Sequence, residues 1–265
     1  MDAQRKQFIQ NTFDTVAPGY DHPAMAFFPA TAERLLAHLQ LDPAARLLDV
    51  CCGTGMVSLR AARMLTEGAV VGVDLSSGML DQARQLKLDN VEFRQMDMEA
   101  LDFERHSFDA ATCSFGLFFI DDMEQALREI AARIKPGGKL AISTFAADAF
   151  EPMASLFLRR YESFGQETRD AAWKRIATES ELRALFATAG LDEVVIHHEP
   201  LSYPLTAPDW WAIVWNAGYR GYLQQLSEAE RAAFRQQHLA EIEQLCAAGK
   251  GRLNVGVMVA VARIG

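Results

Sequence analysis

Strand-like and helix-like segments alternate along the first 145 residues, and this alternation restricts the possible fold more than any other feature of the chain. Short β-rich runs are found at 46–50, 69–74, 90–95, 108–114 and 139–145, with helical patterns at 56–66, 77–87 and 122–134. The segment 135–138 (Lys-Pro-Gly-Gly) ends the last of these helices and permits a tight turn. Such alternation predicts parallel strands joined by right-handed crossovers, and hence an α/β fold with helices on both faces of a sheet.

The second half of the chain adds helices and two more strands. A helix over 179–189 is ended by Gly190, and the runs 193–199 and 253–263 are β-rich. The connection of about fifty residues between these runs is too long to lack structure of its own. We therefore expect a single domain over 1–265 with a Rossmann-like, seven-stranded, mostly parallel sheet, divided into an N-terminal cap (1–30), a ligand-binding core (31–145 and 179–200), two helical insertions (146–178 and the lid 201–250) and a last strand (251–265).

The charge balance excludes one broad class of partner. The chain has 26 Lys and Arg against 35 Asp and Glu, a formal net charge of −9, whereas a nucleic-acid-binding protein would be basic. We find no apolar run of membrane-spanning length and no targeting segment at the N-terminus. The four cysteines form no C-x-x-C pair, so we expect no metal site, reduced thiols and a cytoplasmic protein. A small-molecule partner is the remaining expectation, for a monomer or a homodimer.

Two carboxylates and a glycine turn stand where the first two predicted strands end. Asp49 precedes the turn Gly53-x-Gly55, and Asp74 ends the second strand. In open α/β sheets ligands bind beyond the carboxyl ends of the strands, where glycine allows close approach. A carboxylate there can accept both hydroxyls of a ribose, in hydrogen bonds of about 1.5–3 kcal/mol each. The pattern predicts a nucleoside-containing ligand, although Asp74 alone could also cap the helix that starts near Ser77.

The residue at the third glycine position distinguishes between two candidate nucleoside cofactors. Nicotinamide dinucleotides are bound by G-x-G-x-x-G, but here the third position is Ser58. Asp49 would repel a pyrophosphate, whereas it suits the ammonium group of S-adenosylmethionine (SAM), which has a ribose, a cationic sulfonium and no phosphate. These residues favour SAM as the cofactor, with S-adenosylhomocysteine (SAH) as its product. The alternatives are a non-catalytic, regulatory SAM-binding protein and an NAD-dependent oxidoreductase.

Six stretches in order along the chain resemble the class I SAM-dependent methyltransferases, and among them the group of ubiquinone/menaquinone-biosynthesis C-methyltransferases. They are 11–21, 47–55, 70–80, 97–101, 108–117 and 127–143. The resemblance implies a SAM-dependent methyltransferase without a metal. It also implies that the cofactor is bound by Tyr20, Asp49, Cys51, Gly53, Gly55, Asp74, Leu75, Met79, Asp97, Met98 and Ser114.

Within this set the resemblance assigns each part of SAM to its own residues. Asp49 and the backbone at 51 and 53 would face the methionine part, and Asp74 would hold the ribose. The adenine would meet Leu75 or Met79, Asp97 and Met98, while the ammonium would meet the Ser114 carbonyl and the carboxylate would meet Tyr20. The family usually has Gly at position 51, where Cys51 can be accommodated if its φ is negative.

The acceptor pocket is expected to be aromatic, for a small, partly hydrophobic molecule. Its candidate residues are Phe115, Phe118 and Phe119 after the fourth strand, and Trp211 and Trp215, which share a helical face with Tyr222. Rings over the sulfonium would exclude water and add cation–π attraction. The alternative is that they only pack the insertion onto the sheet.

No catalytic residue is evident from the sequence. Methyl transfer from SAM is an in-line displacement, in which the protein mainly aligns the reactants and excludes water. A general base is needed only if the acceptor must lose a proton. The weak candidates are His22, Tyr203 and the adjacent His197 and His198, which would point to opposite faces of a strand.

Overall fold

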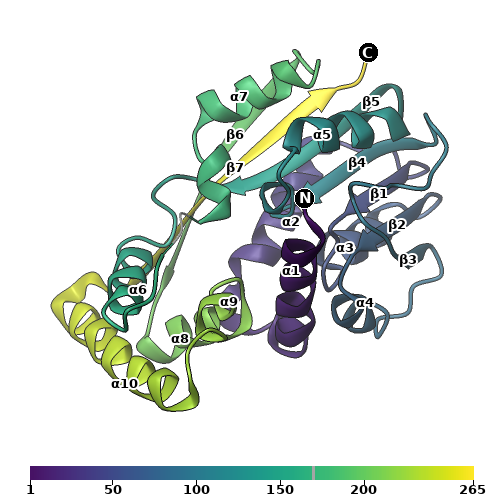
Figure 1. Cartoon of the computed structure of the whole chain (residues 1–265). Coiled ribbons are helices and arrows are strands. Elements are labelled where there is room, and N and C mark those ends of the chain that lie inside the picture. Colours follow the sequence, from purple (N-terminus) through teal and green to yellow (C-terminus); the bar gives the residue numbers. More distant parts are fainter. Residues whose placement is uncertain (169–170) are drawn as a thin grey trace.

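A computed structural model describes residues 1–168 and 171–265 (Figure 1). Its seven strands form one sheet in the order β3-β2-β1-β4-β5-β7-β6. Of the described strands β7 alone runs opposite to the rest, since it pairs antiparallel with both β5 and β6. The predicted seven-stranded, mostly parallel fold is therefore confirmed. The strands are β1 (Arg46–Val50), β2 (Ala69–Asp74), β3 (Val91–Gln95), β4 (Phe108–Ser114), β5 (Ile134–Phe145), β6 (Val194–Pro204) and β7 (Arg252–Arg263).

Helices cover both faces of this sheet. In Figure 1, α2 (Phe27–Leu39) and α3 (Met56–Met64) lie behind the strands, and α5 (Met123–Arg133) and α7 (Glu179–Thr188) lie in front. Helix α5 begins where Asp122 accepts a hydrogen bond from the Gln125 backbone N–H at 2.9 Å, and it buries one apolar stripe. The short α4 (Ser77–Ala83) packs beside β3.

The chain reverses its direction of travel across the sheet at β1. It runs outward from β1 to β2 and β3, and then returns to place β4 on the other side of β1. Both central strands are buried over almost their whole length. A crevice opens at the carboxyl ends of the strands at such a reversal point, which is the usual ligand position in open α/β sheets.

Some element bounds differ from the sequence-based expectation. The helices predicted over 56–66 and 77–87 end earlier, at Met64 and Ala83. Strand β5 begins at Ile134 rather than 139, with a shift in its pairing to β4 before Lys139. Strand β6 continues to Pro204 rather than ending at 199, because an edge strand tolerates proline, which has no N–H to donate.

The inserted helices form a body at the far end of the long antiparallel pair β6–β7 (Figure 1). They are α6 (Met153–Glu162), α8 (Ala207–Asn216), α9 (Arg220–Leu223) and α10 (Glu228–Leu245), which a short helical turn, Cys246–Lys250, continues. The short helical turn Ala172–Ile176 packs instead against α7, β5 and Leu117–Phe119. Trp210 of α8 is fully buried and donates its indole N–H to His238 of α10 at 2.8 Å. The predicted insertion over 146–178 includes residues 169 and 170, which lie outside the described residues.

The N-terminal segment is tied to the core by polar contacts. It consists of α1 (Ala3–Val16) and two short turns, Ala17–Gly19 and Pro23–Met25. Asp14 accepts hydrogen bonds from the Ser76 hydroxyl at 2.6 Å and the Gly78 N–H at 2.9 Å. Asp21 accepts another from the Thr54 hydroxyl at 2.6 Å. These contacts fix α1 beside α4, over the carboxyl ends of the strands.

The described part of the chain has neither a membrane-spanning helix nor a metal-binding cluster. No helix there is long and apolar enough to cross a membrane. No three His, Cys, Asp or Glu side chains of the described residues gather in a way that could hold a metal ion.

Candidate functional site

Two adjoining pockets lie at the carboxyl ends of β1, β2 and β4. The first encloses about 780 Å³ of empty space, counting the part open to solvent, and the second about 420 Å³. Helix α1 closes the first pocket with Ile9, Gln10 and Phe13. The two pockets share Tyr20, Cys51, Gly53, Ser114 and Phe115. These five shared residues make the two pockets parts of one crevice at the strand ends.

The structure brings nearly all of the predicted cofactor residues to these pockets. Asp49 lines the second pocket, and the first is lined by Tyr20, Cys51, Gly53, Asp74, Leu75, Met79, Asp97, Met98 and Ser114. Gly55 lines neither. It stands at the start of α3 with φ +85°, and a Cβ there would lie 3.0 Å from the Phe93 ring. Gly55 is therefore a turn and packing residue in this structure.

Asp74 is held in place by backbone N–H groups of the glycine turn and of the start of α4. Its carboxylate accepts one hydrogen bond from the Gly53 N–H and one from the Ser76 N–H, both at 2.9 Å. Helix α4 is capped by Ser76, whose hydroxyl accepts from the Met79 N–H at 3.1 Å. Asp74 is therefore not the helix cap, and lone pairs of both its oxygens remain for a ligand. Burial raises the pKa of this carboxyl.

Asp49 is a buried carboxylate with two hydroxyl partners. It accepts hydrogen bonds from Ser58 at 2.6 Å and from Thr112 at 2.8 Å. Burial raises its pKa to about 6, against the lowering effect of these hydrogen bonds. Ser58, which breaks the glycine fingerprint, thus supplies the polar partner that a buried carboxylate needs.

Cys51 adopts a backbone conformation that favours glycine. Its φ is +56°, so the expectation that a negative φ accommodates this residue is wrong. The structure makes room for the side chain at Gly116, where an added Cβ would lie 2.5 Å from the Cys51 Cβ. A hydrogen bond to Cys113 and burial raise the pKa of the Cys51 thiol well above its usual value. A thiol held protonated in this way is a wall of the pocket rather than a nucleophile.

Asp97 connects the pocket to the N-terminal helix. Its carboxylate pairs with Lys6 of α1, and Lys6 also pairs with Glu99 at 2.9 Å. The other Asp97 oxygen accepts the Glu99 N–H at 3.0 Å. The residue assigned to the adenine is therefore also an anchor of α1.

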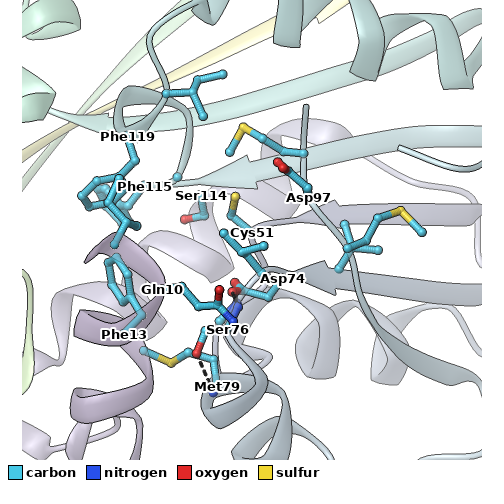
Figure 2. Close-up of a pocket in the computed structure, with 18 of the residues that line it drawn as sticks. Gln10, Phe13, Cys51, Asp74, Ser76, Met79, Asp97, Ser114, Phe115 and Phe119 are labelled. Atoms are coloured by element: carbon cyan, nitrogen blue, oxygen red, sulfur yellow. Dashed lines mark hydrogen bonds between the residues drawn. The ribbon is translucent and has the colours of Figure 1, made fainter. Parts of the chain in front are cut away.

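Five aromatic rings form an arc along the pockets. Phe119, in the turn Leu117–Phe119, meets Phe13 with 5.2 Å between ring centroids, and Phe13 meets Tyr20 at 6.2 Å. Tyr20 stacks on Phe28 at 5.1 Å, and Phe28 meets Phe115 at 5.3 Å. Burial, with Asp74 and Asp21 nearby, raises the pKa of the Tyr20 hydroxyl. Figure 2 shows Phe13, Phe115 and Phe119 on one side of Cys51 and Ser114, and Asp97 on the other.

The N-terminal part of this wall was not anticipated from the sequence. Ile9, Gln10 and Phe13 were not among the expected site residues, although Ile9 and Phe13 are spaced i, i+4 on one helix face. Of the predicted acceptor residues, Phe115 and Phe119 line the first pocket. Phe118 is buried and packs towards Phe145, at 6.3 Å between ring centroids.

The other predicted aromatic residues lie away from both pockets. Trp211 and Trp215 of α8 contact each other at 5.9 Å between ring centroids, and Arg235 and Arg220 lie over their faces. Trp215 is 37% exposed. The contacts of these two residues are thus with the inserted helices, and neither residue lines a described pocket.

None of the candidate bases lines a pocket either. His22 caps the turn Pro23–Met25 by accepting the Ala24 N–H at 3.1 Å. As expected for neighbours on a strand, His197 and His198 point to opposite faces: His197 stacks on His38 of α2, while His198 pairs with Glu179 of α7 at 3.0 Å. Tyr203 follows them on β6, outside the residues that line either pocket.

Basic side chains are missing from the walls of the site. No Lys, Arg or His of the described residues is among those that line the two pockets. The walls carry the three carboxylates Asp49, Asp74 and Asp97 instead. Such a site disfavours phosphate-bearing ligands and favours a cationic one.

Fold and site together define a class of protein. The sheet is Rossmann-like, with carboxylates at the carboxyl ends of β1 and β2 and Ser58 in place of the third glycine of the dinucleotide fingerprint. Together with acidic pockets that disfavour phosphate, this is the arrangement expected of a class I methyltransferase. Comparison with known proteins agrees: a methyltransferase domain model matches residues 47–138.

Two curated relatives extend the match beyond that core. A demethylmenaquinone methyltransferase from Lactiplantibacillus plantarum is 31% identical, over 70% of this chain and 88% of that protein. A 2-phytyl-1,4-naphtoquinone methyltransferase from Thermosynechococcus vestitus is 32% identical, over 73% and 93%. The chain therefore belongs to the family of SAM-dependent methyltransferases, and within it resembles the ubiquinone/menaquinone-biosynthesis group.

Solved structures share the fold at lower identity. The YcgJ protein from Bacillus subtilis superposes with a TM-score of 0.59 at 19% identity, covering 88% of this chain and 97% of its own. A phosphoethanolamine N-methyltransferase from Haemonchus contortus, solved with phosphomonomethylethanolamine and SAH, has a TM-score of 0.55 at 19% identity, covering 88% of this chain and 52% of its own.

Proposed function

We propose that this SAM-dependent methyltransferase methylates a ring carbon of a small, hydroxylated aromatic molecule of the hydroquinone type. The observation that supports this most strongly is the lining of the first pocket, which combines the Asp74 carboxylate with the rings of Phe13 and Phe119. The names of the two curated relatives, which act on a demethylmenaquinone and on a phytyl naphthoquinone, point to the same class of acceptor.

The residues present fit SAM. Asp74 would hold the ribose, and Asp97 and Met98 would contact the adenine. An added Cβ at Gly53 would meet nothing within 4 Å, so the backbone there leaves space for the methionine part beside Asp49. Among the described residues no Lys, Arg or His lines the pockets to meet the SAM carboxylate, and the Tyr20 hydroxyl would take that contact. When bound, SAM supplies an activated methyl group on a cationic sulfur.

The contribution of the protein is then alignment and exclusion of water. The arc of rings would face the sulfonium and attract it through cation–π contacts. No described histidine lines the pockets. We propose that the hydroquinone acceptor gives one hydroxyl proton to water before it binds, and that the ring carbon beside the resulting phenolate takes the methyl group as SAH leaves. The proton on that carbon then passes through solvent to the phenolate oxygen, which restores the aromatic ring and its hydroxyl.

Asp49 gives this assignment a pH dependence. The SAM ammonium would favour the ionised carboxylate, whose pKa without ligand is about 6. Lowering the pH from 7 to 5 protonates Asp49, so the Kd for SAM is expected to rise about tenfold. Calorimetric titrations across this range measure the effect. An Asp49→Asn variant should bind more weakly but with a flat profile, and a profile as steep as that of the wild type would remove Asp49 from the ammonium site.

The proposed reaction is tested by incubating the protein with SAM and 1,4-dihydroxynaphthalene under reducing conditions. Mass spectrometry should detect SAH and a product carrying one added methyl group on carbon. SAM binding with no turnover of this compound or of simple hydroquinones would favour the non-catalytic alternative. Stabilisation by NAD but not by SAM would favour the oxidoreductase. A cytoplasmic location and a monomeric or dimeric state stay predictions.

A further inference from the structure

Helix α1 presents two different faces, and one of them completes the pocket. Ile9, Gln10 and Phe13 line the first pocket. Phe8 does not, and it is 47% exposed although it belongs to the same helix. The site is incomplete without α1, because this helix supplies the ring that faces Phe119.

Phe13 and Phe119 leave part of their ring surface open, unlike the neighbouring Phe115 and Phe118. Phe115 and Phe118 are only 8% and 3% exposed and belong to the core. Phe13 and Phe119 are only partly buried, yet both line the pocket and meet edge to face, with an interplanar angle of 83°. Apolar surface left open inside a pocket gains free energy when a flat apolar ligand covers it.

The charge of the walls restricts what can reach these rings. Three carboxylates and no basic side chain line the two pockets among the described residues. A carboxylate or phosphate on the incoming molecule would lose hydration and meet these carboxylates, while the N-terminal ammonium of Met1, which also lines the first pocket, is already paired with Glu99 at 3.0 Å. An uncharged ring would meet neither cost.

We infer that Phe13 of α1 and Phe119 are the specificity-determining residues of the acceptor site: a flat, uncharged ring packs against the open surface that these two touching rings form, while the acidic walls reject anionic molecules of the same size. The inference rests on the proposed function for the claim that the molecule bound there is the methyl acceptor. It makes the docked N-terminal helix, and not the inserted helix α8, the wall that selects the acceptor.

A binding experiment tests this without any turnover. The protein is first saturated with SAH and then titrated calorimetrically with 1-naphthol, or with 1-naphthoate, which has the same rings and a negative charge. We expect 1-naphthol to bind at least tenfold more tightly than 1-naphthoate. Phe13→Ala and Phe119→Ala should each weaken 1-naphthol binding at least tenfold, while the Kd for SAH changes less than twofold. Phe8→Ala, on the same helix, is the matched control and should bind both ligands as the wild type does.

The outcomes separate the two proposals. If SAH binds but 1-naphthol does not, or if the Phe13→Ala and Phe119→Ala variants bind 1-naphthol like the wild type, the assignment of these rings is overturned. Equal binding of 1-naphthoate would overturn the charge argument. If the naphthol results are as expected but 1,4-dihydroxynaphthalene is not methylated, the proposed reaction is wrong, while the assignment of Phe13 and Phe119 to ring binding is supported. Unchanged SAH affinity in the variants also shows that they are folded.

Discussion

An Asp74→Ala variant is expected to bind SAM on the order of 100- to 1000-fold more weakly than the wild-type protein, because up to two charge-assisted hydrogen bonds to the ribose are lost. The loss has a second cause. The Gly53 and Ser76 N–H groups, each 2.9 Å from the carboxylate, would lose their acceptor, and the glycine turn would be less ordered before the ligand arrives. Isothermal titration calorimetry with SAM measures the change.

Asp81→Ala is the matched control for this variant. Asp81 lies on the neighbouring helix α4, and its side chain is 73% exposed. Its removal changes the net charge by the same amount but should leave the Kd for SAM within twofold. If Asp74→Ala also bound SAM within twofold of the wild type, the ribose would not be held at the end of β2.

Gly116→Ala is expected to destabilise the protein by about 2–3 kcal/mol, as overpacking of a tight contact does. The backbone at Gly116 suits alanine, with φ −108° and ψ −36°, so the effect is steric. The added Cβ would lie 2.5 Å from the Cys51 Cβ and 3.1 Å from the Cys113 Sγ. For a chain of this size the melting temperature should fall by roughly 5–10 °C, measured by thermal unfolding.

Cys51→Gly should rescue this variant. It removes the closest atoms, and glycine adopts the φ of +56° at position 51 without strain. The double variant should regain most of the lost stability, with the contact to Cys113 as the remaining cost. Gly218→Ala, where an added Cβ meets nothing within 4 Å, controls for the substitution itself. A double variant no more stable than Gly116→Ala would show that Cys51 is not the residue Gly116 makes room for.

Much of the fold was predictable because its core strands are marked locally. The strands β1, β2 and β4 have the bounds expected from the sequence. Each is a short apolar run, and a strand buried on both faces needs such a composition wherever it occurs. Strand β2 ends at the acidic Asp74, and a glycine follows β1 and β4 within three residues. Strand β6 was expected to be shorter, because Pro200 and Pro204 are excluded only from a central strand and its place at the edge is not visible in its own residues.

The part of the candidate site on the strands was also predictable, whereas the part on α1 was not. Asp49 and Asp74 follow from the position of parallel strand ends. Phe13 lines the pocket because α1 docks there, held by contacts such as that between Lys6 and Asp97, which are 91 residues apart. Nothing in a single sequence pairs these two charges.

The inserted helices show the same limit. The stripe of Trp211 and Trp215 was expected over the site, but the fully buried indole of α8 is Trp210, which donates to His238, 28 residues later. The spacing of aromatic residues indicates that a helix has a buried face. Which neighbour that face meets is decided by where α6 and α10 pack, a tertiary choice that the periodicity of one helix does not contain.

The central claim, that SAM and its acceptor share the pocket between the strand ends and α1, is tested most directly by a crystal structure of the protein with SAH. The account predicts both ribose hydroxyls within hydrogen-bonding distance of the Asp74 carboxylate. It also predicts the SAH sulfur beside Cys51 and Ser114, with its open side facing Phe13 and Phe119. SAH bound in another place, or in this pocket with its ribose away from Asp74, would contradict it.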